Sequence, residues 1–135
     1  MILLVEDNED HALLIQRNLE KIASERKVVH LSDGEQAINF LHSAAKEDPK
    51  PALILLDLRL PRVDGIEVLR EIKNTSALQS IPVIILTTSS ADDDMNRAYD
   101  LRANSYLVKP ADFGQFKSLM HDLGEYWLEW NRTPE

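Results

Sequence analysis

A regular alternation between short apolar runs and longer amphipathic segments most constrains how this chain can fold. The apolar runs have four or five residues each, the length of a strand, and lie at Ile2–Val5, Val28–Leu31, Ala52–Leu56, Val83–Leu86 and Ser105–Val108. Most of these runs contain no alternating polar residue. They therefore predict strands that are buried on both faces, as in a parallel sheet.

The segments between the runs carry apolar residues at helical spacing. The stripes are Ala12, Ile15, Leu19 and Ile22; Ala37, Ile38, Leu41 and Ala45; Ile66, Leu69 and Ile72; Met95, Ala98 and Tyr99; and Phe113, Phe116, Met120, Leu123, Trp127 and Trp130. Each stripe predicts a helix with one buried face, and Asp112 lies where the last helix needs an N-cap. Alternating strands and helices predict an α/β fold: a three-layer, doubly wound, five-stranded parallel sheet in the flavodoxin-like order 2-1-3-4-5. We expect one domain at residues 1–130 and a C-terminal tail at 131–135.

Charge and composition limit the cellular setting and the partners. Aspartate and glutamate number 23 against 15 lysines and arginines, so the net charge is −8, which disfavours binding to nucleic acid or an anionic membrane. The chain has no cysteine, which excludes disulfides, thiolate catalysis and cysteine-ligated metals. No apolar run is long enough to span a bilayer, and the apolar start runs directly into Glu6 and Asp7. We expect a cytoplasmic protein without nucleic-acid or membrane partners.

Polar side chains follow the apolar runs at the points where the predicted strands end. Glu6 and Asp7 follow the first run, Asp57 the third, Thr87 the fourth and Lys109 the fifth. Since the carboxyl ends of parallel strands share one edge of the sheet, these side chains should meet there. Neighbouring carboxylates repel one another, and a site built from oxygen ligands alone favours a hard divalent cation such as Mg²⁺.

This set of groups suits phosphoryl transfer. Asp57 is a candidate nucleophile that forms an acyl phosphate. Mg²⁺, Lys109 and the Thr87 hydroxyl would stabilise charge on the transferred oxygens.

At these positions the chain resembles the receiver domain of two-component response regulators. The resemblance extends from Ile2 to about Trp130 and rests on four motifs in order: Val5-Glu6-Asp7-Asn8, Leu55–Pro61 with Asp64-Gly65, Leu86-Thr87-Thr88, and Tyr106–Pro110. It implies that a histidine kinase phosphorylates Asp57. It also implies that Asp7 and Asp57 bind Mg²⁺ through their side chains, Glu6 through a coordinated water and Arg59 through its backbone carbonyl. The acidic pair is often two aspartates in that family, and here it is Glu6 with Asp7.

The same resemblance implies a switch. Thr87 would hydrogen-bond the phosphoryl group, Lys109 would pair with it, and Tyr106 would rotate inward as Thr87 moves. The Lys109–Pro110 peptide bond, usually cis in that family, is expected to be cis here as well.

Within that family the chain is similar to small stand-alone regulators paired with bacterial phytochromes. The similarity lies in the stretch Ala98–Tyr106 and in an aromatic end to the last helix, Glu125–Leu128. It implies a phytochrome-type kinase as the partner. We expect no output domain after the fifth helix, so the signal would pass to a downstream protein, to a phosphotransfer partner or to a second copy of the chain.

The predicted output surface consists of the fourth helix, the fifth strand and the fifth helix. Tyr126, Trp127 and Trp130 extend the apolar stripe of the last helix beyond the length that the sheet covers. Aromatic residues of this kind anchor protein interfaces, so we expect them in a homodimer or docking interface. The alternative is that the rings fold back and complete the monomer core.

Two other functions share the fold or the chemistry. A flavodoxin-like electron carrier binds the flavin phosphate in a hydroxyl-rich loop after the first strand, but here that loop is the acidic Glu6–Asp10. A phosphatase of the haloacid dehalogenase type needs a second aspartate at position 59, which is Arg59. We expect neither, and no enzymatic activity beyond promotion of the protein's own phosphorylation and dephosphorylation. The four histidines are not spaced as metal ligands, and we expect them at the surface or at the edge of the core. They are His11, His30, His42 and His121.

Overall fold

The computed structural model describes residues 1–132 and contains one parallel five-stranded sheet in the order β2-β1-β3-β4-β5. The strands are β1 (Ile2–Val5), β2 (Val28–Leu31), β3 (Leu53–Leu56), β4 (Val83–Thr87) and β5 (Ser105–Val108). The predicted runs match these bounds to within one residue, and the predicted strand order is confirmed.

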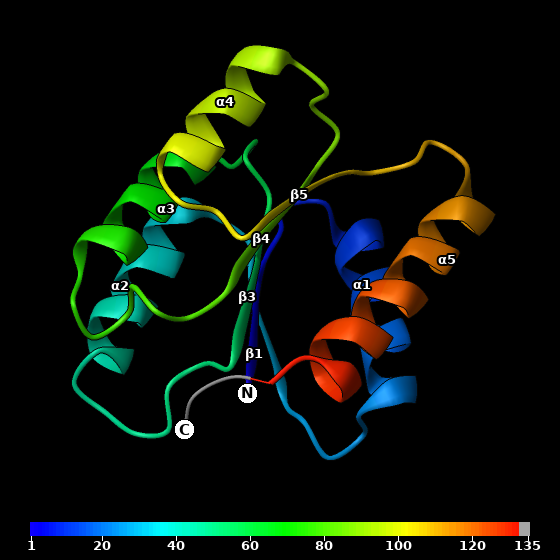
Figure 1. Cartoon of the computed structure of the whole chain (residues 1–135), viewed down its shortest axis with the longest axis horizontal. Coiled ribbons are helices and arrows are strands. Elements are labelled where there is room, and N and C mark those ends of the chain that lie inside the picture. Colours follow the sequence, from blue (N-terminus) through cyan, green and yellow to red (C-terminus); the bar gives the residue numbers. More distant parts are fainter. Residues whose placement is uncertain (133–135) are drawn as a thin grey trace.

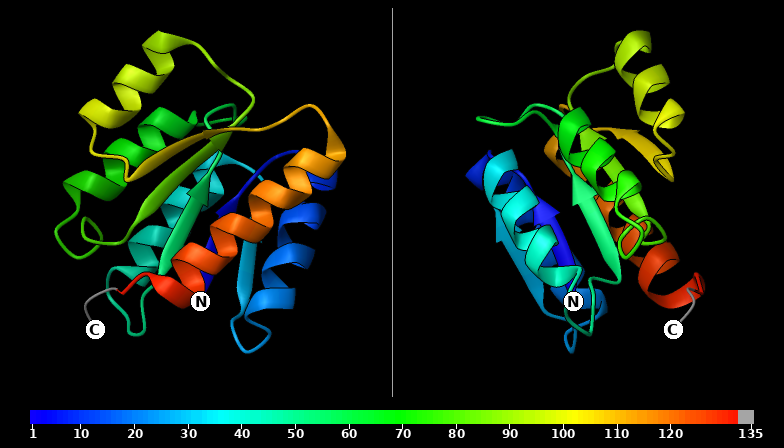
Figure 2. Two further views of the ribbon diagram at one scale, coloured as in Figure 1. Left: turned by 45° about the vertical axis from the view of Figure 1, so that its right-hand side comes forward. Right: turned by 90° about the vertical axis from the view of Figure 1, so that its left-hand side faces the viewer.

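Helices cover both faces of the sheet. They are α1 (Glu9–Ile22), α2 (Gly34–Ala44), α3 (Gly65–Asn74), α4 (Asp92–Asp100) and α5 (Phe113–Gly124), and α5 continues into the π-helical turn η1 (Glu125–Trp130). Figure 1 shows α2, α3 and α4 on one face and α1 with α5 on the other, and the turned views in Figure 2 show the same three layers. None of the described helices is long and apolar enough to cross a membrane.

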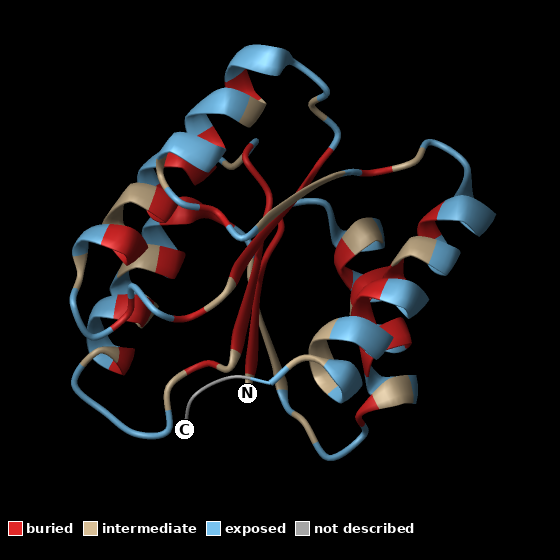
Figure 3. Ribbon diagram, viewed as in Figure 1, coloured by how far each residue is buried: buried red, intermediate tan, exposed pale blue. Residues whose placement is uncertain are grey.

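The core lies on the two faces of the three central strands. Every residue of β1, β3 and β4 is buried, whereas the edge strands β2 and β5 are mostly half-buried (Figure 3). One apolar cluster joins the sheet to α2, α3 and α4, and a second joins it to α1 and α5. This double burial explains why the strands read as uninterrupted apolar runs in the sequence.

Side-chain caps fix the starts of four helices. Asn8, Asp33, Asp64 and Asp112 each accept a hydrogen bond from a backbone N–H in the first turn of α1, α2, α3 or α5. The cap at Asp112 is the one predicted from the sequence. All four caps follow the carboxyl end of a strand, so they fix the loops at the edge of the sheet where the site was expected.

The stripe of the last helix is only partly core. Phe116, Met120 and Leu123 are buried, but Phe113 is 71% exposed. The prediction that Phe113 covers the sheet is wrong because Phe113 is the first residue of α5, at the end that leads away from the sheet (Figure 1). Of the predicted tail at 131–135, residues 133–135 lie outside the described residues.

Candidate functional site

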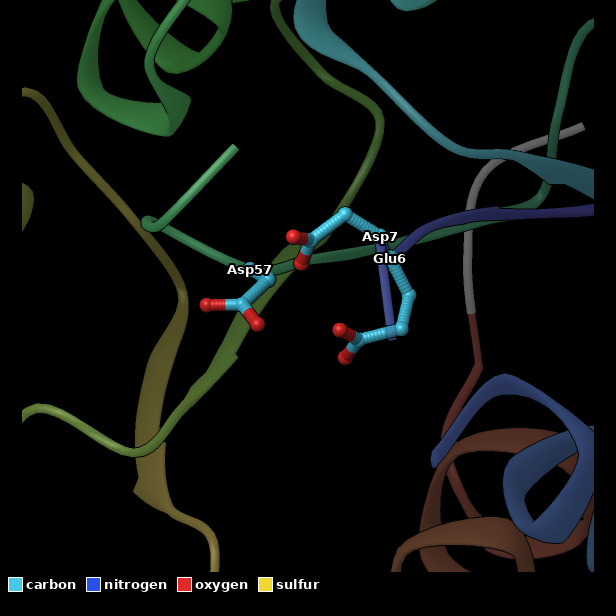
Figure 4. Close-up of side chains that lie close together, drawn as sticks. All are labelled: Glu6, Asp7 and Asp57. Atoms are coloured by element: carbon cyan, nitrogen blue, oxygen red, sulfur yellow. The ribbon is translucent and has the colours of Figure 1, made fainter. Parts of the chain in front are cut away.

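Three carboxylates meet at the carboxyl edge of the sheet. Val5 pairs with Leu56 in the β1–β3 ladder, which places Glu6 and Asp7 beside Asp57 (Figure 4). One oxygen from each carboxylate lies within 4.8 Å of the others. Glu6 and Asp57 are buried and Asp7 is exposed. The sequence expectation that these three side chains converge is therefore confirmed.

Lys109 lies between the two buried carboxylates. Its Nζ donates to Glu6 Oε1 at 2.5 Å and to Asp57 Oδ2 at 2.9 Å. The side chains of Glu6, Asp57 and Lys109 are almost completely buried, so these charges interact with little solvent screening. Lys109, which follows the fifth strand, thus lies at the site, as its position in the sequence indicated.

The charge of this cluster is not balanced by Lys109 alone. The pKa of Glu6 is raised from 4.5 to about 7, first by burial and then by the negative charge of Asp57, while Lys109 opposes both. Two buried carboxylates and an exposed third lie near one lysine. Their negative charge exceeds its positive charge, so the cluster can bind a further cation. The donor set consists of oxygen atoms, and it fits a hard divalent cation.

The backbone around Asp57 is held closely. The Arg59 N–H donates to Asp57 Oδ1 at 3.1 Å, and the Gly65 N–H donates to the Leu58 carbonyl at 3.0 Å. A Cβ atom at Gly65 would lie 2.2 Å from the Asp57 carbonyl oxygen, so only glycine permits this approach of α3 to the end of β3. Asp64 and Gly65 therefore serve the geometry of the loop that carries Asp57.

A second group of contacts ties the loop after β4 to its neighbours. Thr87 is fully buried, and its Oγ1 accepts a hydrogen bond from the Ser89 N–H at 3.4 Å. Tyr106 Oη donates to the Ser89 carbonyl at 2.9 Å, and burial raises the pKa of this phenol. Asp94 Oδ2 accepts from Arg59 Nη2 and from Ser89 Oγ, both at 2.6 Å. The Thr87 loop is thus joined to β5, to α4 and to the loop after β3.

The structure corrects one expectation and adds one residue. The cis peptide bond within the described residues is Asp48–Pro49, so the prediction of a cis Lys109–Pro110 bond is wrong. The trans form of an X–Pro bond is the more stable by about 0.5–1 kcal/mol, and Lys109 reaches both carboxylates from it. His11 is half-buried, as expected of a core-edge residue, and its Nδ1 lies 3.0 Å from Lys109 Nζ, a contact that was not predicted. No local pattern in the sequence points to this contact, because His11 and Lys109 are 98 positions apart.

The predicted interface residues lie away from the acidic cluster. Tyr126 and Trp130 of η1 are 53% and 78% exposed. Trp127 is half-buried and packs against the apolar cluster of α1 and α5. The rings of Tyr126 and Trp127 meet edge to face with centroids 5.3 Å apart. Part of this aromatic group thus completes the monomer core, and part of it is exposed.

A parallel 2-1-3-4-5 sheet with an acidic cluster and a buried lysine at its carboxyl edge agrees with the receiver domains that the sequence resembles. The family model of the response regulator receiver domain matches residues 2–121. The chain therefore belongs to the response regulator receiver domain family.

Relatives of known name or structure are similar over nearly their full length. A probable methanogenesis regulatory protein, FilR2 of Methanothrix harundinacea, is 48% identical and is matched over 99% of this chain and 87% of its own length. Response regulator Rcp1 of Synechocystis is 40% identical, over 96% of this chain and 89% of its own. The structure of the phosphorylated cyanobacterial phytochrome response regulator RcpA superposes with a TM-score of 0.93 at 40% identity, covering 99% of this chain and 97% of that one. A structure of Rcp1 with bound Mn²⁺ has a TM-score of 0.87 at 36% identity, covering 99% and 98% of the two chains.

Proposed function

We propose that this protein is a response regulator that accepts a phosphoryl group from a histidine kinase on Asp57 in a Mg²⁺-dependent reaction. The observation that carries the proposal is the buried contact of Asp57 with Lys109, 2.9 Å long, beside Glu6 and Asp7. A carboxylate in this position is a nucleophile with positive charge already fixed beside it. The phosphorylated form of RcpA, which has the same fold, supports the assignment.

In the proposed reaction, a carboxylate oxygen of Asp57 attacks the phosphorus atom of a phosphohistidine. The new P–O bond forms as the P–N bond breaks, and the imidazole nitrogen leaves with the bonding electron pair and takes a proton. Lys109 donates to an oxygen of the transferred group, and the Thr87 hydroxyl, at the end of the neighbouring strand, donates to another. Both groups are buried, which strengthens their interaction with the charge that moves onto those oxygens.

The residues that would hold Mg²⁺ are Asp7 and Asp57 through their carboxylates, Arg59 through its carbonyl and Glu6 through a water. The proximity of the three carboxylates and the raised pKa of Glu6 support a cation at this place. When bound, Mg²⁺ supplies positive charge to the transferred oxygens. The Mn²⁺-bound structure of Rcp1 supports a divalent ion in this fold.

We further propose that Thr87 and Tyr106 carry the switch and that the surface of α4, β5 and α5, with Tyr126, Trp127 and Trp130, transmits it. The bond from Tyr106 to the Ser89 carbonyl supports the first point, since any movement of the Thr87 loop must break or move it. The exposed apolar side chains of Tyr99, Val108 and Trp130 support the second. The occupant would be a second copy in a homodimer, a downstream protein or a phosphotransfer partner.

The remaining parts of the proposal concern extent, place and partner. Residues 1–130 would form the receiver domain, in the cytoplasm, with no catalysis beyond its own phosphorylation and dephosphorylation. A phytochrome-type kinase is the first candidate partner, which the similarity to Rcp1 and RcpA supports. A histidine kinase from a methanogen should be tested beside it, because the chain is also similar to FilR2.

The test is phosphorylation of the purified protein by acetyl phosphate with Mg²⁺, followed by intact mass. The wild type should gain one phosphate-sized increment, and Asp57→Asn should gain none. The matched control is Asp100→Asn, an exposed aspartate at the end of α4, which should label like the wild type. Full labelling of Asp57→Asn, or equal labelling in excess chelator, would contradict the assignment of the acceptor or of the metal.

A further inference from the structure

Lys109 makes a third side-chain contact in addition to those with its two carboxylates. A lysine ammonium has three N–H donors and no acceptor. Here they are directed at Glu6 Oε1 at 2.5 Å, Asp57 Oδ2 at 2.9 Å and His11 Nδ1 at 3.0 Å. Since Lys109 can only donate, His11 Nδ1 must accept, and the proton of the neutral ring must be on Nε2. The third acceptor on this lysine is therefore an uncharged nitrogen from a different part of the fold.

The ring of His11 is itself held in place. It belongs to the first turn of α1 and packs on Phe116 of α5, with ring centroids 5.3 Å apart and an angle of 58° between the planes. Phe116 is buried in the apolar cluster of α1 and α5. Burial, together with the charge of Lys109, lowers the pKa of His11, which agrees with a neutral ring that accepts. The packing of one helical layer thereby fixes an acceptor at the edge of the acidic cluster.

We propose that His11 is a positioning residue for Lys109: by fixing one of its three N–H groups, it directs the other two toward Glu6 and Asp57. This inference rests on the proposed function. When a phosphoryl group enters on Asp57, only the donor that points to Asp57 needs a new acceptor, because His11 and Glu6 keep the other two. Without the acceptor at His11, the ammonium group loses one of the contacts that determine its direction. It must then be oriented during the reaction, which slows the reaction.

A purely structural role for His11 is the alternative, because the ring also fills space against Phe116. Two substitutions separate the roles. His11→Phe keeps an aromatic ring on Phe116 and removes the acceptor, whereas His11→Gln changes the packing and keeps an acceptor oxygen. His42→Phe is the matched control, because His42 is exposed and bonds Glu71 on the face of α2 and α3.

The rate constant for phosphorylation by acetyl phosphate, measured over a range of donor concentrations in Mg²⁺, is the first measurement. Loss of one hydrogen bond of ordinary strength corresponds to about a fivefold change, so His11→Phe should lower the maximal rate by about that factor and leave the half-saturating donor concentration unchanged. His11→Gln should recover to within about twofold of the wild type, and His42→Phe should equal it. A wild-type rate in His11→Phe overturns the inference. Equal slowing in His11→Phe and His11→Gln also overturns it, because packing would then be the cause.

Long-range ¹H–¹⁵N NMR of the His11 ring is the second measurement and needs no phosphorylation. The wild type should show the tautomer with the proton on Nε2, and Lys109→Met should release that preference. A ring that populates both tautomers in the wild type overturns the inference even where phosphorylation is normal. A wild-type protein that takes up no phosphate overturns the proposed function and, with it, the effect of His11 on rate, whatever tautomer the ring shows.

Discussion

Among residues 1–132, two lysines are buried, at opposite edges of the sheet, and each is only 6% exposed. Lys109 follows β5 at the carboxyl edge and bonds two carboxylates. Lys73, near the end of α3, lies at the amino edge. Its Nζ donates to three neutral oxygens: the carbonyls of Gln79 at 3.2 Å and Ile81 at 3.5 Å, and Asn104 Oδ1 at 3.4 Å. The two lysines are equally buried but differ in the charge of their acceptors.

That difference separates the lysine of the proposed phosphorylation site from a lysine that joins segments of the fold. Burial first, and then the charge of Arg102, lower the pKa of Lys73, since no described carboxylate pairs with it. Its acceptors belong to the loop before β4 and to the residue before β5, so it joins those segments. Two acceptors of Lys109 are carboxylates of the acidic cluster, where we propose that a cation and a phosphoryl group bind. Burial of a lysine is thus a weak sign of function, and the titratable partners are the informative part.

The largest effect that separates the two lysines is expected from Lys109→Met. Removing one partner from a buried ion cluster leaves the others uncompensated, so the free energy of unfolding in chelator should fall by about 3 kcal/mol. Asp57→Asn added to Lys109→Met should recover part of that loss, because the amide needs no cation beside it while Glu6 still lacks its lysine. Urea unfolding of the single and double variants measures both values. Unchanged stability in Lys109→Met would show that the two carboxylates do not depend on this cation.

A smaller loss is expected at the amino edge from Asn104→Ala. Asn104 Oδ1 accepts from the Val83 N–H at 2.9 Å as well as from Lys73. Its removal leaves a donor at the start of β4 without its acceptor, which costs about 1–2 kcal/mol. Hydrogen exchange of the Val83 amide should accelerate in the variant, while the carboxyl edge keeps wild-type protection. Equal acceleration at Asp57 would contradict the independence of the two edges.

The sequence predicted the fold almost completely because the central strands are buried on both faces. Their apolar runs, and the caps and stripes of the helices, are local signals that each element carries by itself. The exposure of Phe113 at the start of α5 escaped prediction, because its helical period is correct while the sheet does not reach that far. The period of a stripe tells which side of a helix is apolar. How much of that side is buried depends on how far the neighbouring sheet extends along the helix.

The acidic cluster was predictable for a different reason, since strand-end residues share one edge in any parallel sheet. His11 was not, because its partner Lys109 is 98 positions away and a lone histidine in a first helical turn is usually at the surface. Lys73 was also missed, although it is seven residues from Ile66, on the stripe that continues through Leu69. The contacts of His11 with Lys109 and of Lys73 with Asn104 join distant segments, which no local pattern contains.

The smallest effect, and the sharpest test of the comparison, is expected from Lys73→Met at neutral pH. Methionine fills a similar volume and removes a buried charge, but it also removes three hydrogen bonds to oxygens, and these terms oppose each other. The stability should therefore change by less than about 1 kcal/mol near pH 7, against the larger loss in Lys109→Met. A loss at Lys73 as large as that at Lys109 would mean that neutral oxygens stabilise a buried lysine as well as carboxylates do.

The pH dependence of that small difference carries a definite sign. The pKa of Lys73 is lowered below 10.5 in the folded protein, so between the lowered pKa and 10.5 the unfolded chain binds more protons than the folded one. In that window the contribution of Lys73 to stability rises with pH, and below it the cost of the buried charge is full and constant. Urea unfolding from about pH 8 to about pH 10 should therefore shift the difference between wild type and Lys73→Met in favour of the wild type. Lys117→Met, at an exposed lysine of α5, is the matched control. A difference that is flat over that range, or one that moves in favour of Lys73→Met, would mean that the folded protein tolerates the charge of Lys73 as well as water does.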